Sequence, residues 1–221
     1  MVFIKGGAFN REYTFEESVM FGLSKTTKKG IQKITLNDFS IGKYPITQAQ
    51  WRAVMGNNPS HFKGNDNCPV ETVSWEDCHE FINNLNKKTG KKYRLPTETE
   101  WEFAARGGDK SKDNEYSGSN NIDEVAWFIG NSEGKTHPIG TKKANELGIY
   151  DMSGNVWEWC SDLNGSYDNR AVSKSKSGVQ DSPHVMRGGS WHSDARRCRV
   201  AVRSAPTERN NRLGFRVVLS S

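Results

Sequence analysis

The side chains of this chain that could do chemistry are four cysteines and one His-Ser-Asp triplet. The cysteines are Cys68, Cys78, Cys160 and Cys198. They lack the Cys-x-x-Cys spacing of zinc or redox motifs, and they could form one or two disulfides or remain buried thiols. His192, Ser193 and Asp194 are consecutive, whereas a Ser-His-Asp relay needs its members arranged by geometry. Neither set predicts an active site by itself.

The composition and charge pattern argue against a nucleic-acid partner and against a membrane-spanning segment. The 221 residues include 31 Lys and Arg and 26 Asp and Glu, a net charge of +5. Both signs are interleaved along the chain, with no basic arm or nucleic-acid motif, so we expect no nucleic-acid partner. No segment approaches the ~20 apolar residues that span a membrane. The chain opens directly on strand-like Met1-Val2-Phe3-Ile4, so an upstream leader could have been removed.

The elements that must position these side chains are few. Thr47, Ser74 and Thr97 can each cap a helix, and the predicted helices end near residues 55, 86 and 104, each with a tryptophan. Strands are predicted at residues 2–4, 32–43, 185–187 and 214–218. Between about 107 and 184 lies a polar region too long for an ordinary connection. The aromatic residues expected to anchor it are Trp127, Tyr150, Trp157 and Trp159.

Seven motifs occur in an order that resembles the formylglycine-generating enzyme, or sulfatase-modifying factor, family. They are Gly6-Gly7-x-Phe9, Tyr44-Pro45-Ile46-Thr47, Pro69-Val70-x-x-Val73-Ser74-Trp75, Arg94-Leu95-Pro96-Thr97-Glu98-x-Glu100-Trp101-Glu102, Gly148-Ile149-Tyr150-Asp151-Met152-Ser153-Gly154-Asn155-Val156-Trp157-Glu158-Trp159, Arg187-Gly188-Gly189-Ser190-Trp191 and Gly214-Phe215-Arg216. The resemblance covers nearly the whole chain, as one domain over 1–221. It implies an α+β, C-type-lectin-like fold with few helices, much irregular structure and a small antiparallel sheet joining the termini. Most of these residues hold the fold, so they do not establish catalysis.

The copper site of the family's oxidases is where this chain departs from the resemblance. Those enzymes use two cysteines, whose positions here are Ser193 and Cys198. A serine hydroxyl stays protonated and is a poor ligand for soft copper(I), so copper is not expected. Cys198 is interpreted as a buried thiol, in preference to a reactive one. If the chain is nevertheless an oxidase, the residues retained for it are Cys198, Ser190, Trp157 and Arg203.

The resemblance also implies a structural calcium site. The matching ligands are the side chains of Asp151 and Glu158 and the backbone carbonyls of Gly154 and Val156. These are hard oxygen ligands of the kind that calcium takes, with waters or other groups completing its shell. The alternative makes Asp151 a turn residue and Glu158 the partner of a nearby arginine.

The segment from about 191 to 212 has few bulky apolar side chains, which suits an exposed, adaptable surface. The chain resembles the variable proteins of diversity-generating retroelements, those of treponemes above all, whose C-terminal region is rewritten by adenine-directed mutagenesis. From Arg187 to the end there are eight arginines and no lysine. Arg187, Arg199, Arg203 and Arg216 could equally form ion pairs. The expected ligand contacts are His192, Ser193, Asp194, Ala195, Arg197, Val202, Ser204, Ala205, Pro206 and Arg209.

The leading hypothesis is therefore a non-catalytic protein whose surface binds a protein or glycan ligand. We expect a monomer at the cell surface or outside the cell. The first alternative is a formylglycine-generating oxidase, or a degenerate relative that acts on a thiol. The second is a purely structural accessory domain of a larger surface protein.

Overall fold

A computed structural model describes residues 1–19, 24–164, 183–206 and 208–220. Its helices are α1 Gln48–Met55, α2 Trp75–Thr89, α3 Glu98–Ala105 and α4 Ile122–Val125, with 3-10 turns η1 Gly108–Lys110 and η2 Ala195–Cys198. Its strands are β1 Val2–Ile4, β2 Ala8–Val19, β3 Ser24–Thr35, β4 Phe39–Ile41, β5 Tyr93–Arg94, β6 Trp157–Leu163, β7 His184–Arg187, β8 Arg203–Ser204, β9 Leu213–Gly214 and β10 Val218–Leu219. No helix in the described ranges is long and apolar enough to cross a membrane.

The three predicted helices are confirmed, and each begins as its sequence indicates. Thr47, Ser74 and Thr97 accept hydrogen bonds from the backbone three residues on, and each belongs to a reciprocal capping box. Left-handed Gly56 and Gly90 end α1 and α2, because glycine adopts that conformation without the penalty of a Cβ atom. Helix α2 runs three residues beyond the predicted end at residue 86, to Thr89.

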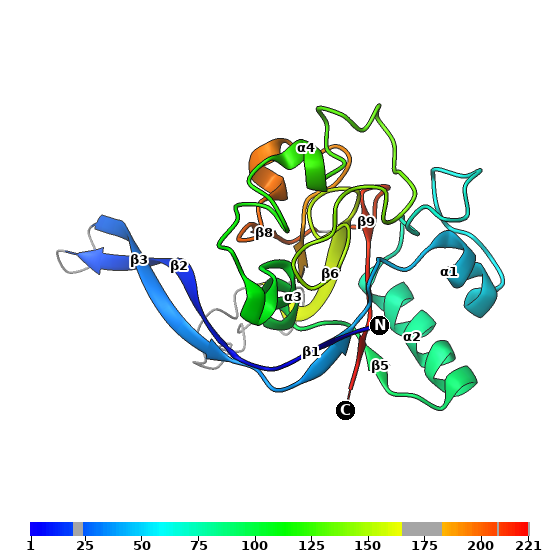
Figure 1. The fold of residues 1–221 in the computed structure, drawn as a ribbon, viewed down its shortest axis with the longest axis horizontal. Helices are drawn as coiled ribbons and strands as arrows, with labels where there is room; N and C mark the ends of the chain where they lie inside the picture. Colours follow the sequence, from blue (N-terminus) through cyan, green and yellow to red (C-terminus); the bar gives the residue numbers. More distant parts are fainter. Residues whose placement is uncertain (20–23, 165–182, 207, 221) are drawn as a thin grey trace.

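Two small four-stranded sheets and one hairpin carry the strands. The first sheet has the order β1-β4-β10-β5 and joins the two termini, as expected, with β10 antiparallel to both β4 and β5. The second has the order β8-β7-β6-β9, in which β9 is parallel to β6. Strands β2 and β3 form a separate hairpin that projects from the body of the protein (Figure 1). This α+β arrangement with much irregular structure confirms the predicted class.

Two strand predictions need correction, and some strands were not predicted. The predicted strand at 214–218 is divided between β9 and β10, which belong to different sheets, because buried Phe215 and Arg216 connect them. The predicted strand at 32–43 is interrupted after Thr35, and β4 begins only at Phe39. The hairpin and β6 were not predicted, and part of the long polar region, residues 165–182, lies outside the described residues.

Aromatic side chains anchor the core, as the composition indicates. Trp101 is fully buried in a cluster between α3 and the sheet of the termini. Trp157 and Trp159 lie in a second cluster with α1 and α2. Trp127 and Tyr150 are only half-buried, and Trp127 stacks on His137 with ring centroids 3.7 Å apart. All four cysteines are buried free thiols, which resolves the alternative left open by their spacing.

Candidate functional site

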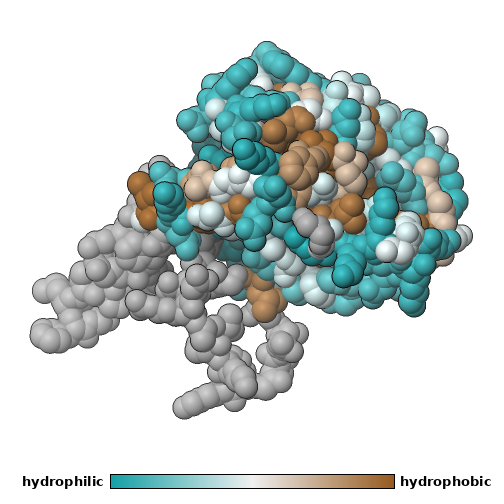
Figure 2. All heavy atoms as spheres, turned by 60° about the horizontal axis from the view of Figure 1, so that its bottom comes forward, coloured by the Kyte–Doolittle hydropathy of each residue, from teal (hydrophilic) through white to brown (hydrophobic). Residues whose placement is uncertain are grey.

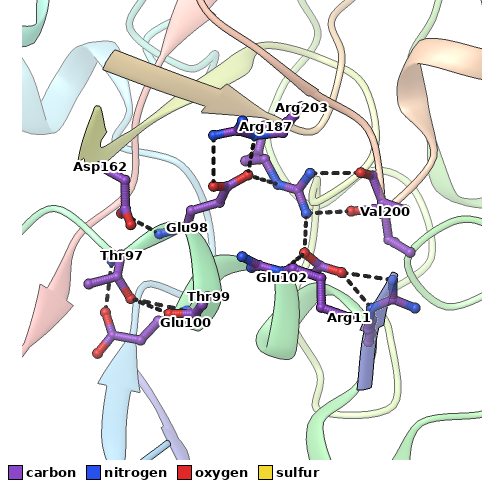
Figure 3. A network of polar contacts seen from close by, with 12 residues as sticks. Arg11, Thr97, Glu98, Thr99, Glu100, Glu102, Asp162, Arg187, Val200 and Arg203 are labelled. Atoms are coloured by element: carbon purple, nitrogen blue, oxygen red, sulfur yellow. Dashed lines mark hydrogen bonds and ion pairs between the residues drawn. The ribbon is translucent and has the colours of Figure 1, made fainter. Parts of the chain in front are cut away.

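The segment between β7 and β8 begins and ends on one buried network of charges (Figure 3). Arg187, the last residue of β7, donates to Glu102 of α3 at 2.7 Å, and Arg203 at the start of β8 donates to Glu98 of the same helix at 2.9 and 3.1 Å. These two arginines also face one another across the β7–β8 ladder. Helix α3 therefore holds both ends of the intervening loop, residues 188–202.

Arg187 also holds the loop from inside. Its guanidinium donates to the backbone carbonyls of Val200 at 3.0 Å and Ala201 at 2.9 Å. Glu102 accepts as well from Arg106 at 2.7 Å, and its ion pair with Arg11 of β2 spans 2.9 Å. Because these groups are buried and hydrogen-bonded, the loop backbone starts from a preorganised position.

The first half of the loop turns tightly against its own second half. Gly189 has a φ of +79°, and a Cβ atom at that position would lie 2.7 Å from the sulfur of Cys198. Only glycine permits this approach without a shift of the thiol or the backbone. Trp191 is then fixed by two hydrogen bonds, from its N–H to Asn155 and from its indole to the carbonyl of Asn211, at 2.8 and 2.9 Å.

Ser190, Ser193 and Cys198 lie together beneath this turn, and none of them is displayed to solvent. The Ser190 N–H donates to Ser193 Oγ at 3.0 Å, and the two hydroxyl oxygens are 3.2 Å apart. Cys198 is fully buried, and desolvation raises the pKa of its thiol to about 12, with Asp194 adding a smaller rise. The thiolate that metal binding or nucleophilic attack requires is therefore strongly disfavoured at neutral pH.

The other residues retained for an oxidase have structural partners elsewhere. Trp157 packs in the cluster of α1 and α2, apart from the cluster of Tyr116, Val125 and Ala126 that surrounds Cys198. Arg203 is committed to Glu98. Ser190 thus lies close to Cys198. Trp157 instead packs in the core, and Arg203 belongs to the buried charge network.

Four of the expected ligand contacts lie at the surface on the same short stretch. His192, Asp194 and Arg197 are exposed, and Ala195 is partly exposed. Asp194 caps η2 by accepting from the Arg197 N–H at 3.0 Å, so the turn is locally fixed while both long side chains stay in solvent. Ser193 lies between His192 and Asp194 in the sequence but is buried. Its hydroxyl is part of the scaffold rather than a displayed contact.

The remaining expected contacts are more heterogeneous. Val202, Ser204, Ala205 and Pro206 are partly exposed, while Thr207 lies outside the described residues. Arg209 is exposed and reaches Asp77 at the start of α2, with 3.2 Å between Nη1 and Oδ2. The four arginines named as ion-pair candidates all have carboxylate partners: Arg187 with Glu102, Arg199 with Glu115, Arg203 with Glu98 and Arg216 with Glu158.

Two neighbours of this surface were missed by sequence reasoning. Ile129 is 56% exposed, and its N–H donates to the Ser193 carbonyl at 3.0 Å. Phe62 meets Trp191 edge-on at 5.2 Å. Both residues come from loops far away in the chain, and no local pattern indicates the contact.

Asp151 and Glu158, the two proposed calcium ligands with carboxylates, are buried, and Glu158 belongs to an ion pair. Glu158 is fully buried, and its two carboxylate oxygens accept from Arg216 at 2.6 and 2.7 Å, with Trp101 donating to one of them at 2.6 Å. Asp151 has a φ of +57° and accepts from the Gly140 N–H at 2.8 Å. Desolvation raises the pKa of this carboxyl to about 6.

In this arrangement Glu158 does not fit a calcium ligand, because Arg216 already supplies its counter-charge. The ion-pair alternative therefore describes Glu158, and the positive φ of Asp151 suits its reading as a turn residue. Gly154 and Val156 are also buried. No group of three or more His, Cys, Asp or Glu side chains in the described ranges has the arrangement of a metal site. Calcium binding stays a prediction of the family resemblance, and the Glu158–Arg216 ion pair argues against it.

Comparison with known proteins identifies the family. The family of sulfatase-modifying factor enzyme 1-like domains matches residues 1–221. The chain belongs to this family. As a sulfatase-modifying factor family member, it is 36% identical to the chaperone protein LppX of Paenibacillus barcinonensis, over 91% of this chain and 81% of that protein.

Two further relatives of this sulfatase-modifying factor family member bear on its chemistry. The inactive C-alpha-formylglycine-generating enzyme 2 of Bos taurus is 29% identical over 94% of this chain and 66% of that protein. The structure of Treponema denticola variable protein 1 matches with a TM-score of 0.82 and 30% identity, over 99% of this chain and 94% of that one. The resemblance to treponemal variable proteins is confirmed.

Proposed function

We propose that this protein is a non-catalytic ligand-binding protein that displays residues 192–209 to a protein or glycan target. One observation carries the proposal: a single short segment holds buried Ser193 and Cys198 under exposed His192, Asp194 and Arg197. The buried set fixes the backbone, and the exposed set is free to vary. Because the loop is held before a ligand arrives, binding would cost little ordering entropy.

The similarity to a variable protein supports a diversified surface. We also propose that the protein is a monomer, that it lies at the cell surface or outside the cell, and that its target is a protein or a glycan. The nucleotide sequence offers a direct check on diversification. We expect a nearby template copy of the last part of the gene that differs mainly at adenines; without one, the diversification idea fails while ligand binding remains.

The binding surface can be tested with two matched libraries. One randomises exposed His192, Asp194, Ala195 and Arg197, and the control library randomises exposed Glu80, Lys87, Lys88 and Lys91 on and after α2. Both are selected against the same purified protein and immobilised glycan targets. We expect binders from the first library and folded, non-binding variants from the second. Equal yields from the two libraries would show that the loop has no special capacity for recognition.

The alternative function is oxidation of a thiol, favoured only by the proximity of Ser190 and Cys198. Its assay is oxygen consumption with added copper and a cysteine-containing sulfatase-type peptide. We expect no turnover, because Cys198 is a buried, protonated thiol and Ser193 replaces the second thiolate. Turnover that disappears in Cys198→Ala would overturn the binding-only proposal.

A further inference from the structure

A cavity lies where the hairpin meets the segment that follows α3. Its volume is about 720 Å³, within the range of ~300–1,000 Å³ that is typical of ligand sites. Figure 1 shows the hairpin leaving the body of the protein near α3. The cavity is separate from the surface at 192–209, and it is lined by Ala8, Phe9, Asn10, Lys33, Phe103, Arg106, Gly108, Asp109, Ser111 and Asp113.

The lining shows that the cavity borders an edge of β2. Ala8, Phe9 and Asn10 are successive residues of this strand, and all three line the cavity. Successive side chains of a strand point to opposite faces. A cavity bounded by three successive residues therefore runs along the strand's edge and is not confined to one face. Strand β3 contributes only Lys33.

The hydrogen-bond register shows which backbone groups point to that edge. Gly7 and Leu36 lie opposite one another next to the Ala8–Thr35 pair, and the Leu36 N–H donates to the Gly7 carbonyl at 2.9 Å. Hydrogen-bonded and non-hydrogen-bonded pairs alternate in an antiparallel ladder. The Phe9–Ile34 pair is therefore hydrogen-bonded as well. Ala8 and Asn10 direct their N–H and C=O groups away from β3.

These outward groups have no partner strand. In the described part of the chain, β2 pairs with β3 alone, and neither Ala8 nor Asn10 is in another backbone hydrogen bond. An open strand edge of this kind is a template for pairing with a further strand. A two-stranded hairpin is marginally stable alone, so a third strand would also stabilise it.

The cavity wall gives the chemistry of the side chain that would enter. Phe9 and Phe103 form an aromatic floor with ring centroids 5.7 Å apart. Arg106 is already paired with Glu102 at 2.7 Å. Exposed Asp109 and Asp113 have no ion pair in the described part of the structure, and neither does exposed Lys33, so the lining holds two unpaired carboxylates and one unpaired ammonium group. A lysine or arginine side chain would lay its apolar stem on the rings and place its charge near these carboxylates.

We propose that the edge of β2 at Ala8 and Asn10 binds an extended peptide segment of a protein partner by strand addition, with a basic side chain in the cavity. Backbone hydrogen bonds would supply affinity, and the cavity would supply selectivity for the basic residue. This site goes beyond the proposed ligand surface and does not depend on it.

The probe is a displayed library of linear 12-residue peptides, selected on the wild-type protein and remade as soluble peptides. The decisive variant is Ala8→Pro, which removes an N–H that points to the free edge. Its matched control is Thr35→Pro, which removes the corresponding N–H on the outer edge of β3 from the same residue pair. Proline is tolerated at sheet edges where no hydrogen bond is lost.

We expect enriched peptides with a lysine or arginine whose affinity falls at least about tenfold in Ala8→Pro and less than about threefold in Thr35→Pro. A library without enriched peptides, or equal losses in the two variants, would overturn strand addition at β2. If Ala8→Pro does not fold, peptides N-methylated at single positions are tested on the wild-type protein. Loss of binding at alternate positions supports the proposal, and uniform tolerance refutes it.

Two further variants test the role of the cavity and separate the β2 site from the 192–209 surface. Asp109→Asn combined with Asp113→Asn should weaken basic peptides about tenfold or more and leave peptides with norleucine at that position unchanged. A change of His192 and Arg197 to alanine should leave peptide affinity unaffected. If the latter change abolishes binding, the peptides occupy the 192–209 surface, and the β2 site is wrong.

Discussion

Arg216 and Arg197 have the same side chain and opposite environments. Arg216 is fully buried and reaches Glu158 at 2.6 Å, whereas the Arg197 side chain is 69% exposed and lies 4.0 Å from Asp194. The first arginine cannot change without leaving a buried charge unpaired. The second can change at little cost. The difference separates a buried scaffold from a surface that can vary.

The largest effect that tests this comparison should come from Glu158→Gln. It removes the negative charge that compensates Arg216, and breaking a buried pair in this way costs ~3–5 kcal/mol. The matched control is Asp194→Asn, which removes a carboxylate from the exposed pair and keeps a side chain that can cap η2. Urea unfolding should show a change of less than ~0.5 kcal/mol for the control. Similar losses for the two variants would remove the distinction between scaffold and surface.

A smaller loss is expected for Ser193→Ala. The Ser193 hydroxyl accepts from the buried Ser190 N–H at 3.0 Å, and an unsatisfied buried donor costs ~1–3 kcal/mol. Ser204→Ala is the control, because no hydrogen bond of that partly exposed hydroxyl is found in the described part of the structure. Urea unfolding compares the two. An unchanged free energy of unfolding in Ser193→Ala would show that the Ser193 hydroxyl does not support the loop, and Ser193 would again be a candidate ligand contact.

Sequence reasoning predicted the parts of this molecule that depend on neighbours along the chain. The capping boxes at Thr47, Ser74 and Thr97 are local hydrogen-bond patterns, and all three helices follow them. Ser193 looked like one more small polar surface residue, because its burial depends on the turn that brings Ser190 over Cys198.

Long-range pairing was beyond the same reasoning. Glu158 has two sensible partners in sequence terms, a metal ion or an arginine, and only the fold places Arg216 against it. The hairpin of β2 and β3 was missed because its polar strands lack a clear apolar alternation. The division of residues 213–219 between two sheets likewise depends on contacts with distant β6 and β4.

Histidines of the packed interior and of the exposed loop should also differ in how their protonation affects stability. His79 and His184 both lie against Trp75, with ring centroids 3.8 Å from it. Burial lowers the pKa of both histidines. His184 lowers the pKa of His79 further, and Glu76 raises it. The pKa of His184 is raised in part by Ser161, Asp162 and Glu76. The unfolded chain therefore binds protons more readily than the folded protein as the pH falls through about 6.5, and stability decreases.

His79→Phe should reduce this loss, since it retains an aromatic ring against Trp75 and removes one titrating group. One histidine contributes at most ~1.4 kcal/mol per pH unit to the slope. Urea unfolding at pH 7.5 and pH 5 measures the change, and His192→Phe, at an exposed position, is the control. A steeper profile in His79→Phe than in the wild-type protein would contradict the burial of a neutral ring.

A still smaller effect is expected when the exposed positions change together. His192→Ala, Asp194→Asn and Arg197→Ala should each alter the free energy of unfolding by less than ~0.5 kcal/mol, as surface substitutions usually do. The triple variant should unfold cooperatively in urea near the wild-type midpoint. A loss of several kcal/mol would show that these side chains support the loop, and a freely variable surface would be excluded.

The smallest expected effect is that of calcium removal on the thermal midpoint. This measurement tests whether Arg216 or a calcium ion compensates the negative charge of Glu158. Arg216 and Trp101 together engage both of its carboxylate oxygens, so the charge is neutralised without a metal ion. A ligand at free concentration c that binds only the folded state stabilises it by RT ln(1 + c/Kd), so the thermal midpoint rises with the ligand concentration. We therefore expect midpoints in excess calcium and in excess EGTA to agree within about 1 °C, less than the several degrees that 1 kcal/mol would produce. A clear rise with calcium that disappears in Asp151→Asn would show that the ion binds after all and draws Glu158 away from Arg216.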